Sequence, residues 1–186
     1  SPISISDLEY LQKEKIPFVV IGNYYLNIET PTVNFDHKKA IKEAITKLLE
    51  FGYKKIALIT GPKGENYVYK SHNFAVEGYK EFLSEHNLQY DEKLVKTTNH
   101  TQEQGYQVME EFYFLPENER PEAIIIATSK PGKGVLKFIE EKKIWNPFII
   151  TYADEEITHP NYILAPYRKL GETAFDLLEK YLKDWT

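Results

Sequence analysis

Two glycine–lysine segments of the sequence could in principle cradle a phosphate group. Residues 61–64 read Gly-Pro-Lys-Gly, and Gly132 is followed directly by Lys133. A phosphate-binding loop needs a leading glycine, four further residues, and then Gly-Lys followed by Ser or Thr. The second segment has Gly134 at the Ser/Thr position and Ala127 at the leading glycine, and the first has no Gly-Lys-Ser/Thr. A GxGxxG dinucleotide fingerprint is absent too, so these glycines are expected to lie in turns.

The residue pattern does not support nucleophilic or metal-assisted catalysis either. No GxSxG elbow surrounds a serine, and Ser71 and His72, as neighbours on a predicted helix, would point about 100° apart. The five histidines form no HExxH or HxxxH pair, and no cysteine could supply a thiolate. We therefore expect no catalytic residue, no metal site and no cofactor, and we do not expect an enzyme.

The elements that position the remaining polar residues follow from hydrophobic patterning. Continuous apolar runs, typical of parallel strands covered on both faces, span residues 17–21, 56–60, 123–127 and 147–150. Amphipathic helix patterns separate or follow them, with Asp36, Thr101 and Ser129 as predicted N-caps and Pro166 near the start of the last helix. Strands that alternate with helices predict an α/β fold with parallel sheets and right-handed crossovers.

Ligands of such sheets bind beyond the carboxyl ends of the strands. This rule nominates four loops, residues 22–25, 61–67, 128–132 and 152–155, which are rich in Gly, Asn, Thr, Ser and Tyr. These residue types suit hydrogen bonding to a neutral polyhydroxyl ligand better than charge chemistry.

Composition narrows the class of protein further. The chain has 186 residues, of which 42% are hydrophobic and 27% charged, and its formal net charge is −5. No apolar run approaches the ~20 residues of a membrane helix, so no membrane association is expected. A nucleic-acid surface usually carries a basic excess, and none is present, so this polypeptide is not expected to hold DNA by itself.

Seven short phrases follow one another in a distinctive order: IPFVVIG (16–22), VNFD (33–36), LEFGYKKIALITG (49–61), EGY (77–79), RPEAI (120–124), YAD (152–154) and LGETA (170–174). Their order resembles that in the effector-binding domains of LacI/GalR transcriptional regulators, over about residues 8 to 183. Each phrase alone is weakly specific, and the resemblance rests on the order of the seven phrases along the chain.

The resemblance implies a two-lobed fold of periplasmic-binding-protein type I, with the effector bound between the lobes. Residues 1–53 and 163–186 would form part of the N-terminal lobe, and residues 54–162 the C-terminal lobe. The helix-turn-helix headpiece, the hinge helix, the first strands and helix of the N-terminal lobe and its closing strands have no counterpart here. The N-terminal lobe is therefore expected to be incomplete.

The family's effector contacts carry over to six positions of this sequence: Ser71, His100, Thr128, Ser129, Asp154 and Tyr167. His100 and Tyr167 match positions that can carry stacking aromatics, and Thr128 with Ser129 replaces an Asn-Asp pair. Ala75 stands where an arginine often holds sugar hydroxyls, and Ala153 replaces the first aspartate of a pair. Both halves of a clamp suited to bidentate hydroxyl recognition are thus absent.

The resemblance predicts a cytoplasmic regulator, expected to be a repressor, that binds a carbohydrate or related metabolite. It also implies a homodimer that reaches operator DNA only through a headpiece absent from this sequence. Two alternatives remain: a periplasmic sugar-binding protein of a transporter, which shares the architecture, and a regulator that senses a protein partner. The absent clamp favours the second of these alternatives over an ordinary free-sugar sensor.

Overall fold

The computed structural model describes residues 4–22, 25, 29–62, 70–153, 161–164 and 166–185. Contacts between Cα atoms divide the chain into two compact units. The larger comprises Asp36–Lys63 and Ser71–Ala165, and the smaller comprises Ser1–Phe35, Gly64–Lys70 and Pro166–Thr186. Each unit is described separately below.

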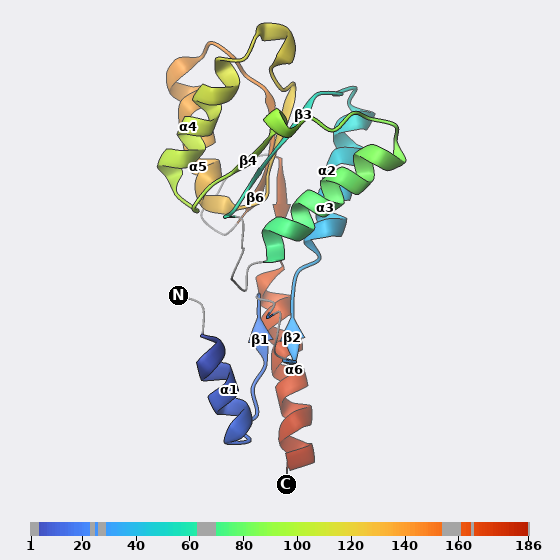
Figure 1. The fold of residues 1–186 in the computed structure, drawn as a ribbon, viewed down its shortest axis with the longest axis vertical. Helices are drawn as coiled ribbons and strands as arrows, with labels where there is room; N and C mark the ends of the chain where they lie inside the picture. Colours follow the sequence, from blue (N-terminus) through green and yellow to red (C-terminus); the bar gives the residue numbers. More distant parts are fainter. Residues whose placement is uncertain are drawn as a thin grey trace. The chain divides into compact units, whose positions relative to one another are not determined.

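The elements follow one another in the order shown in Figure 1. They are α1 (Ile5–Lys13), β1 (Val20–Ile21), β2 (Thr32–Val33), α2 (His37–Glu50), β3 (Ile56–Thr60), α3 (Lys70–Glu85), the 3-10 turn η1 (Glu92–Leu94), β4 (Val95–Thr97), α4 (Gln102–Tyr113), the 3-10 turn η2 (Glu117–Glu119), β5 (Ala123–Ile126), α5 (Ser129–Lys142), β6 (Phe148–Ala153), β7 (Tyr162–Leu164) and α6 (Tyr167–Trp185).

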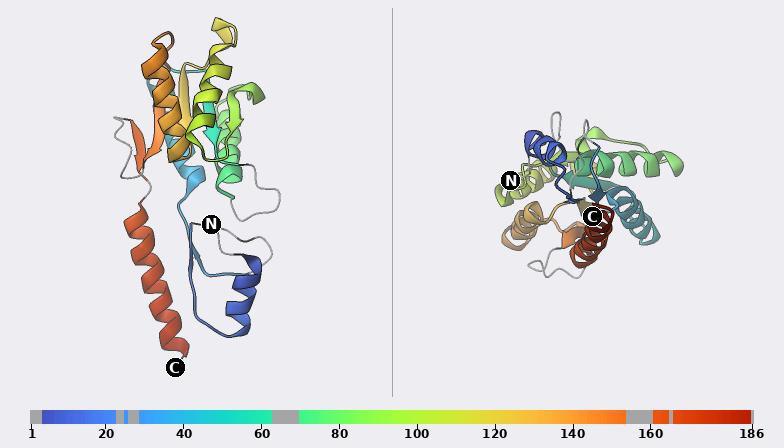
Figure 2. Two further views of the ribbon diagram at one scale, coloured as in Figure 1. Left: turned by 90° about the vertical axis from the view of Figure 1, so that its left-hand side faces the viewer. Right: turned by 90° about the horizontal axis from the view of Figure 1, so that it is seen from below.

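The larger unit is built on a five-stranded parallel sheet in the order β4-β3-β5-β6-β7. Helices α4 and α5 cover one face of this sheet, and α2 and α3 cover the other (Figures 1 and 2). Strands β3 and β5 are buried along their whole length, as expected for strands covered on both faces. Alternate residues such as Ala57, Ile59 and Ile126 join the core under α4 and α5.

Helices α4 and α5 approach each other closely because glycines lie at their contact. A Cβ atom at Gly105 would overlap the carbonyl oxygen of Pro131, and one at Gly134 would overlap that of Gln102. Phe112 and Phe138, one from each helix, are fully buried beneath this contact. The N-terminal halves of the two helices are therefore in direct backbone contact.

On the opposite face, α2 begins at Asp36, whose carboxylate accepts a hydrogen bond from the Lys39 amide at 2.9 Å. This confirms the predicted cap. Ion pairs of 2.5 to 3.2 Å then join Lys38 and Lys42 of α2 to Glu81 and Glu85 of α3. These exposed pairs add little stability by themselves, and the buried apolar stripe of α2 holds the helix on the sheet.

The smaller unit contains a two-stranded parallel sheet, in which Val20 pairs with Thr32 and Ile21 with Val33. Helix α6 contacts both strands and buries Leu170 and Ala174. Helix α1 starts with a capping box between Ser4 and Asp7.

The predicted fold class is confirmed, because parallel sheets are flanked by helices in the predicted alternation. The runs at 56–60 and 123–127 form β3 and β5, whereas α1, β2, β4 and β7 were not predicted. The contact-based division assigns α2 and all of β7 to the larger unit, whereas the predicted lobe boundaries place α2 and residues 163–164 in the N-terminal lobe. Those boundaries stay a prediction.

One predicted helix cap is wrong. Thr128 occupies the N-cap of α5, with an extended backbone at φ −162° and ψ 141°, and Ser129 is the first helical residue. The Thr128 side chain makes no capping hydrogen bond. Among the described helices, none is long and apolar enough to cross a membrane.

Candidate effector site

The candidate site lies where β3, β4 and β5 of the larger unit end. Thr60 pairs with Thr97 across β3 and β4, and Ile59 pairs with Ile126 across β3 and β5. Because the three strands are parallel and in register, the residues that follow them emerge at one edge of the sheet. We call this the carboxyl edge.

His100 follows β4 and reaches toward the end of β5. Its Nδ1 atom shares a hydrogen bond of 3.0 Å with the Thr128 hydroxyl oxygen. Its backbone is left-handed, with φ of 61°, a conformation uncommon in residues other than glycine but enriched in histidine. Partial burial, and secondarily the charge of Lys130, lower the pKa of the His100 imidazole, which favours its neutral form at pH 7.

A second histidine–threonine pair joins α3 to the end of β3. The Thr60 hydroxyl and His72 Nδ1 lie 2.7 Å apart, and both side chains are buried. The Thr98 hydroxyl donates to the Thr60 carbonyl oxygen at 2.9 Å, which ties the end of β4 to that of β3. Buried polar groups are costly unless they are hydrogen-bonded, and these contacts satisfy that requirement.

A third histidine lies at the start of α2. The ring of His37 stacks on that of Tyr152 near the end of β6, with centroids 5.7 Å apart and planes inclined by 13°. Burial lowers the pKa of His37 from 6.5 to about 4. The carboxyl edge thus presents three imidazoles and several hydroxyl groups. Among the described residues no group of three or more His, Cys, Asp or Glu could hold a metal ion.

The six predicted contact residues have different outcomes. His100 and Thr128 are hydrogen-bonded to each other, and Ser129 follows them as the first residue of α5. Ser71 belongs to α3, next to His72. Tyr167 begins α6 in the smaller unit and is 64% exposed, while Asp154 lies outside the described residues. Effector contact by all six stays a prediction.

Sequence reasoning missed several polar residues of this edge: Thr60, Thr98, His37 and His72. Thr60 is the polar last residue of an otherwise apolar strand, and this position in the sequence could have indicated a residue at the carboxyl edge. His72 could not be paired with Thr60 from the sequence, because the pairing depends on how α3 is rotated about its axis.

At the opposite, amino edge of the same sheet, two side chains form hydrogen bonds to backbone groups. The Glu122 carboxylate accepts hydrogen bonds from the Lys54 and Lys55 amides at 2.8 and 3.1 Å, which lowers the pKa of Glu122. The buried Tyr79 hydroxyl donates to the Ile56 carbonyl oxygen at 2.6 Å. A cavity of about 440 Å³ lies among these residues. The Glu122 carboxylate and the Tyr79 hydroxyl that border it are hydrogen-bonded to other groups of the protein.

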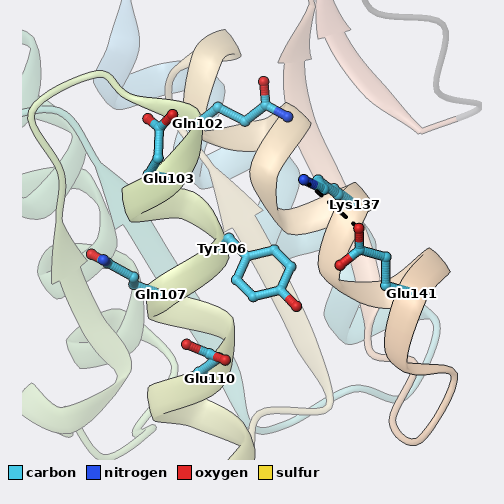
Figure 3. A pocket seen from close by; sticks show the side chains of 7 residues that line it. All are labelled: Gln102, Glu103, Tyr106, Gln107, Glu110, Lys137 and Glu141. Atoms are coloured by element: carbon cyan, nitrogen blue, oxygen red, sulfur yellow. Dashed lines mark ion pairs between the residues drawn. The ribbon is translucent and has the colours of Figure 1, made fainter.

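A larger hollow of about 600 Å³ lies between α4 and α5. Figure 3 shows Tyr106 in this groove, with Lys137 and Glu141 of α5 forming an ion pair of 3.7 Å across from it. The Tyr106 ring packs edge-on against Phe138. The groove runs along the outer side of the two helices, and none of His72, His100 or Thr128 lines it.

Comparison with known families identifies the class of protein. The family model for periplasmic binding proteins and sugar-binding domains of the LacI family matches residues 3–149. The chain therefore belongs to this family, whose regulators are not enzymes, and the predicted resemblance and the predicted absence of catalysis are both confirmed.

Two curated relatives illustrate the match. Catabolite control protein A of Priestia megaterium is 26% identical over 96% of this chain and 55% of its own length. The protein of the same name from Streptococcus mutans serotype c is 32% identical over 91% of this chain and 51% of its own. The chain thus spans about half the length of the curated relatives it matches.

Solved structures agree with this assignment. The transcription regulator CcpA of Lactococcus lactis superposes with a TM-score of 0.80 at 28% identity, over 97% of this chain and 67% of that one. A LacI family regulator of Lactobacillus casei with bound glucose has a TM-score of 0.77 at 17% identity, over 96% of this chain and 77% of that one. The second likeness shows the shared fold alone.

Proposed function

We propose that this chain is the effector-sensing domain of a bacterial LacI-type transcriptional regulator, expected to be a repressor. It would bind a small molecule, a carbohydrate or related metabolite, and thereby control operator binding by the full-length protein. The observation that carries this proposal is the hydrogen-bonded pair of His100 and Thr128, which follow two different strands at the carboxyl edge. In open parallel sheets ligands bind beyond this edge.

Such a domain responds to an effector because the effector binds its alternative conformations with different affinities. An effector that binds one arrangement of the two lobes more tightly shifts the population toward that arrangement. In the full-length cytoplasmic protein, expected to be a homodimer, the shift would reposition paired helix-turn-helix headpieces on a palindromic operator. The net charge of −5 on this chain agrees with DNA contact being made elsewhere in the protein.

The test is thermal unfolding of the chain in the presence of sugars, sugar phosphates and nucleosides. A true effector at 100 times its Kd stabilises the folded state by about 2.7 kcal/mol, which corresponds to roughly 5–10 °C in Tm for a domain of this size. The variant His100→Ala should reduce the shift, while Thr46→Val, which alters an exposed helix hydroxyl remote from the edge, should not.

Two outcomes would contradict the proposal. Stabilisation by a protein partner and by no metabolite would favour a regulator that senses a protein. Tight, salt-sensitive DNA binding by this chain alone would contradict the assignment of operator contacts to a separate headpiece. A helix-turn-helix upstream in the full-length protein would separate the regulator from a periplasmic sugar-binding protein.

A further inference from the structure

The exposed apolar side chains of this protein are concentrated in the smaller unit. Among the described residues, eleven large hydrophobic side chains are exposed, and only Phe51, Phe114 and Ile144 of these belong to the larger unit. Four of the other eight lie on α6, a single helix of 19 residues (Figure 2). Clustered apolar surface of this kind marks sites of interaction, so α6 was searched for an ordered pattern.

Helix α6 carries two apolar stripes along its length. The inner stripe, of which the first two members are buried, consists of Leu170, Ala174, Leu177 and Tyr181. The outer stripe consists of Gly171, Phe175, Leu178 and Leu182. At 3.6 residues per turn the two stripes lie about 100° apart. Since α6 contacts β1 and β2, burial of the inner stripe accounts for its packing within the smaller unit, and the outer stripe needs another explanation.

The outer stripe has the spacing of a helix-pairing seam. Its members follow one another at intervals of four, three and four residues, which is the alternation of the apolar positions in a coiled coil. Phe175 is 67% exposed and Leu182 is 45% exposed, and a Cβ atom added at Gly171 would meet nothing within 4 Å. A surface helix ordinarily has one apolar stripe, facing its own core. The second, open stripe is therefore suited to a second helix.

The shape of the outer stripe is complementary to itself when two copies of α6 run antiparallel. Placing Phe175 opposite Leu178 of the second copy also places Gly171 opposite Leu182 of the second copy. The space beside the glycine then receives the large side chain at both ends of the pair, as close packing requires. A parallel pair would set Gly171 opposite itself and leave a void there.

The charges beside the outer stripe are balanced in the same antiparallel pair. They belong to two exposed ion pairs within α6, Arg168 with Glu172 at 3.8 Å and Glu179 with Lys183 at 3.2 Å. At each end of the pair, the first ion pair of one copy meets the second ion pair of the other. Lys183 of the second copy then lies only about 3 Å along the axis from Glu172. Two cations and two carboxylates thus form a neutral group at each end, and charge favours a second copy as the occupant.

We propose that the outer stripe of α6 is an interface at which two copies of this chain pair with their α6 helices antiparallel. This goes beyond the proposed function, which expects a homodimer but assigns no surface to it. Effector binding at the carboxyl edge does not depend on the outer stripe, so the two proposals can fail separately.

The first experiment measures self-association by sedimentation equilibrium. A single helix pair is a small interface, so the chain should dimerise with a Kd on the order of 10 μM. Phe175→Glu should raise this Kd at least about tenfold, because the symmetric pair would bury two unpaired carboxylates. The matched control is Phe114→Glu, at an 80% exposed position of the larger unit, which should leave the Kd unchanged.

Both substitutions replace exposed side chains, and circular dichroism checks that the variants remain folded. A chain that stays monomeric to about 1 mM would overturn the proposal, since the outer stripe would then be left for a different partner. A dimer that is insensitive to Phe175→Glu but lost in Tyr106→Glu would also overturn it, because the interface would lie between α4 and α5 instead.

The second experiment tests the antiparallel direction with disulfides. The chain has no cysteine, so introduced thiols report on the pairing alone. The double variant Gly171→Cys/Leu182→Cys should form cross-linked dimers on oxidation, whereas each single variant should not. These two positions are about 16 Å apart along one helix, too far for a bond within one chain. Cross-linking by Gly171→Cys alone would show parallel helices and overturn the proposed arrangement, as would failure of the double variant to cross-link.

The third measurement separates this proposal from the effector-sensing function. Any metabolite that raises the Tm of the unaltered chain should raise that of Phe175→Glu by the same amount at saturating concentration. If dimerisation and cross-linking occur as described but no metabolite raises the Tm of either chain, the proposed function fails and the α6 interface stands. A metabolite that stabilises a chain that remains monomeric gives the reverse result and overturns the interface.

Discussion

The two edges of the five-stranded sheet use polar groups in opposite ways. At the amino edge, the Glu122 carboxylate and the buried Tyr79 hydroxyl are hydrogen-bonded to backbone groups of residues 54–56, at the start of β3. At the carboxyl edge, histidine side chains pair with threonine hydroxyls from neighbouring strands and helices. The polar groups of the amino edge therefore contribute to stability, whereas the carboxyl edge is where we propose that a ligand binds. Three experiments test this distinction.

The largest effect is expected from acid at the carboxyl edge. The pKa of His37 is lowered from 6.5 to about 4, so the unfolded chain binds a proton more readily than the folded one. The stability that neutral His37 contributes is present above pH 6.5 and is lost as the pH falls toward 4, on the order of 3 kcal/mol in total. The lowered pKa of His100 acts in the same direction.

Denaturant unfolding between pH 7 and pH 4 measures this loss. His37→Phe keeps a ring against Tyr152 but cannot be protonated, so its stability should depend less steeply on pH over that window. An identical pH dependence in the unaltered chain and in His37→Phe would show that His37 does not titrate as described.

An intermediate effect is expected when one hydroxyl is removed from each edge. Tyr79→Phe leaves the buried Ile56 carbonyl without its donor and should cost about 1–2 kcal/mol of unfolding free energy. Ligand affinity should not change, because Tyr79 lies at the far edge. Thr128→Val, at a partly exposed site, should change the unfolding free energy by less than about 0.5 kcal/mol. This variant should weaken ligand binding instead.

Unfolding free energies and ligand affinities of both variants provide the measurement. If Tyr79→Phe weakened ligand binding as much as Thr128→Val, the functional distinction between the two edges would not hold.

The smallest effect is expected at Glu122. Its pKa is lowered by hydrogen bonds from the Lys54 and Lys55 amides, so its contribution is present above pH 4.5 and is lost as the pH falls below that value. Because the side chain is exposed, the contribution should stay below about 1 kcal/mol. Glu122→Gln should reduce the pH dependence below pH 4.5 and leave the histidine window unchanged, which unfolding curves at pH 3.5 and 5.5 would detect.

The sequence predicted the parts of the fold that depend on local pattern. The apolar runs at 56–60 and 123–127 became β3 and β5 because both strands are covered on both faces. Strand β4 was missed because Val95–Thr97 is short, lies at the sheet's edge and includes a lysine. The left-handed backbone of His100 was also missed, because the enrichment of histidine in this conformation is too weak to assign it to one residue.

The candidate site was predictable to a similar degree. Parallel strands imply a common carboxyl edge, so the position of the site followed from the strand pattern. The pairing of His72 with Thr60 and the packing of His100 over Gly61 did not, because both depend on how elements distant in sequence are oriented against each other. Both contacts are determined by tertiary packing and not by local sequence.

The glycine contacts between α4 and α5 have a consequence for binding thermodynamics. His100 lies two residues before α4 and Thr128 directly before α5, and the N-terminal halves of these helices touch at Gly105 and Gly134. The loops that carry the two residues are thus preorganised relative to each other before any ligand arrives. A ligand that binds there does not have to order them, so little conformational entropy is lost on their side of the complex.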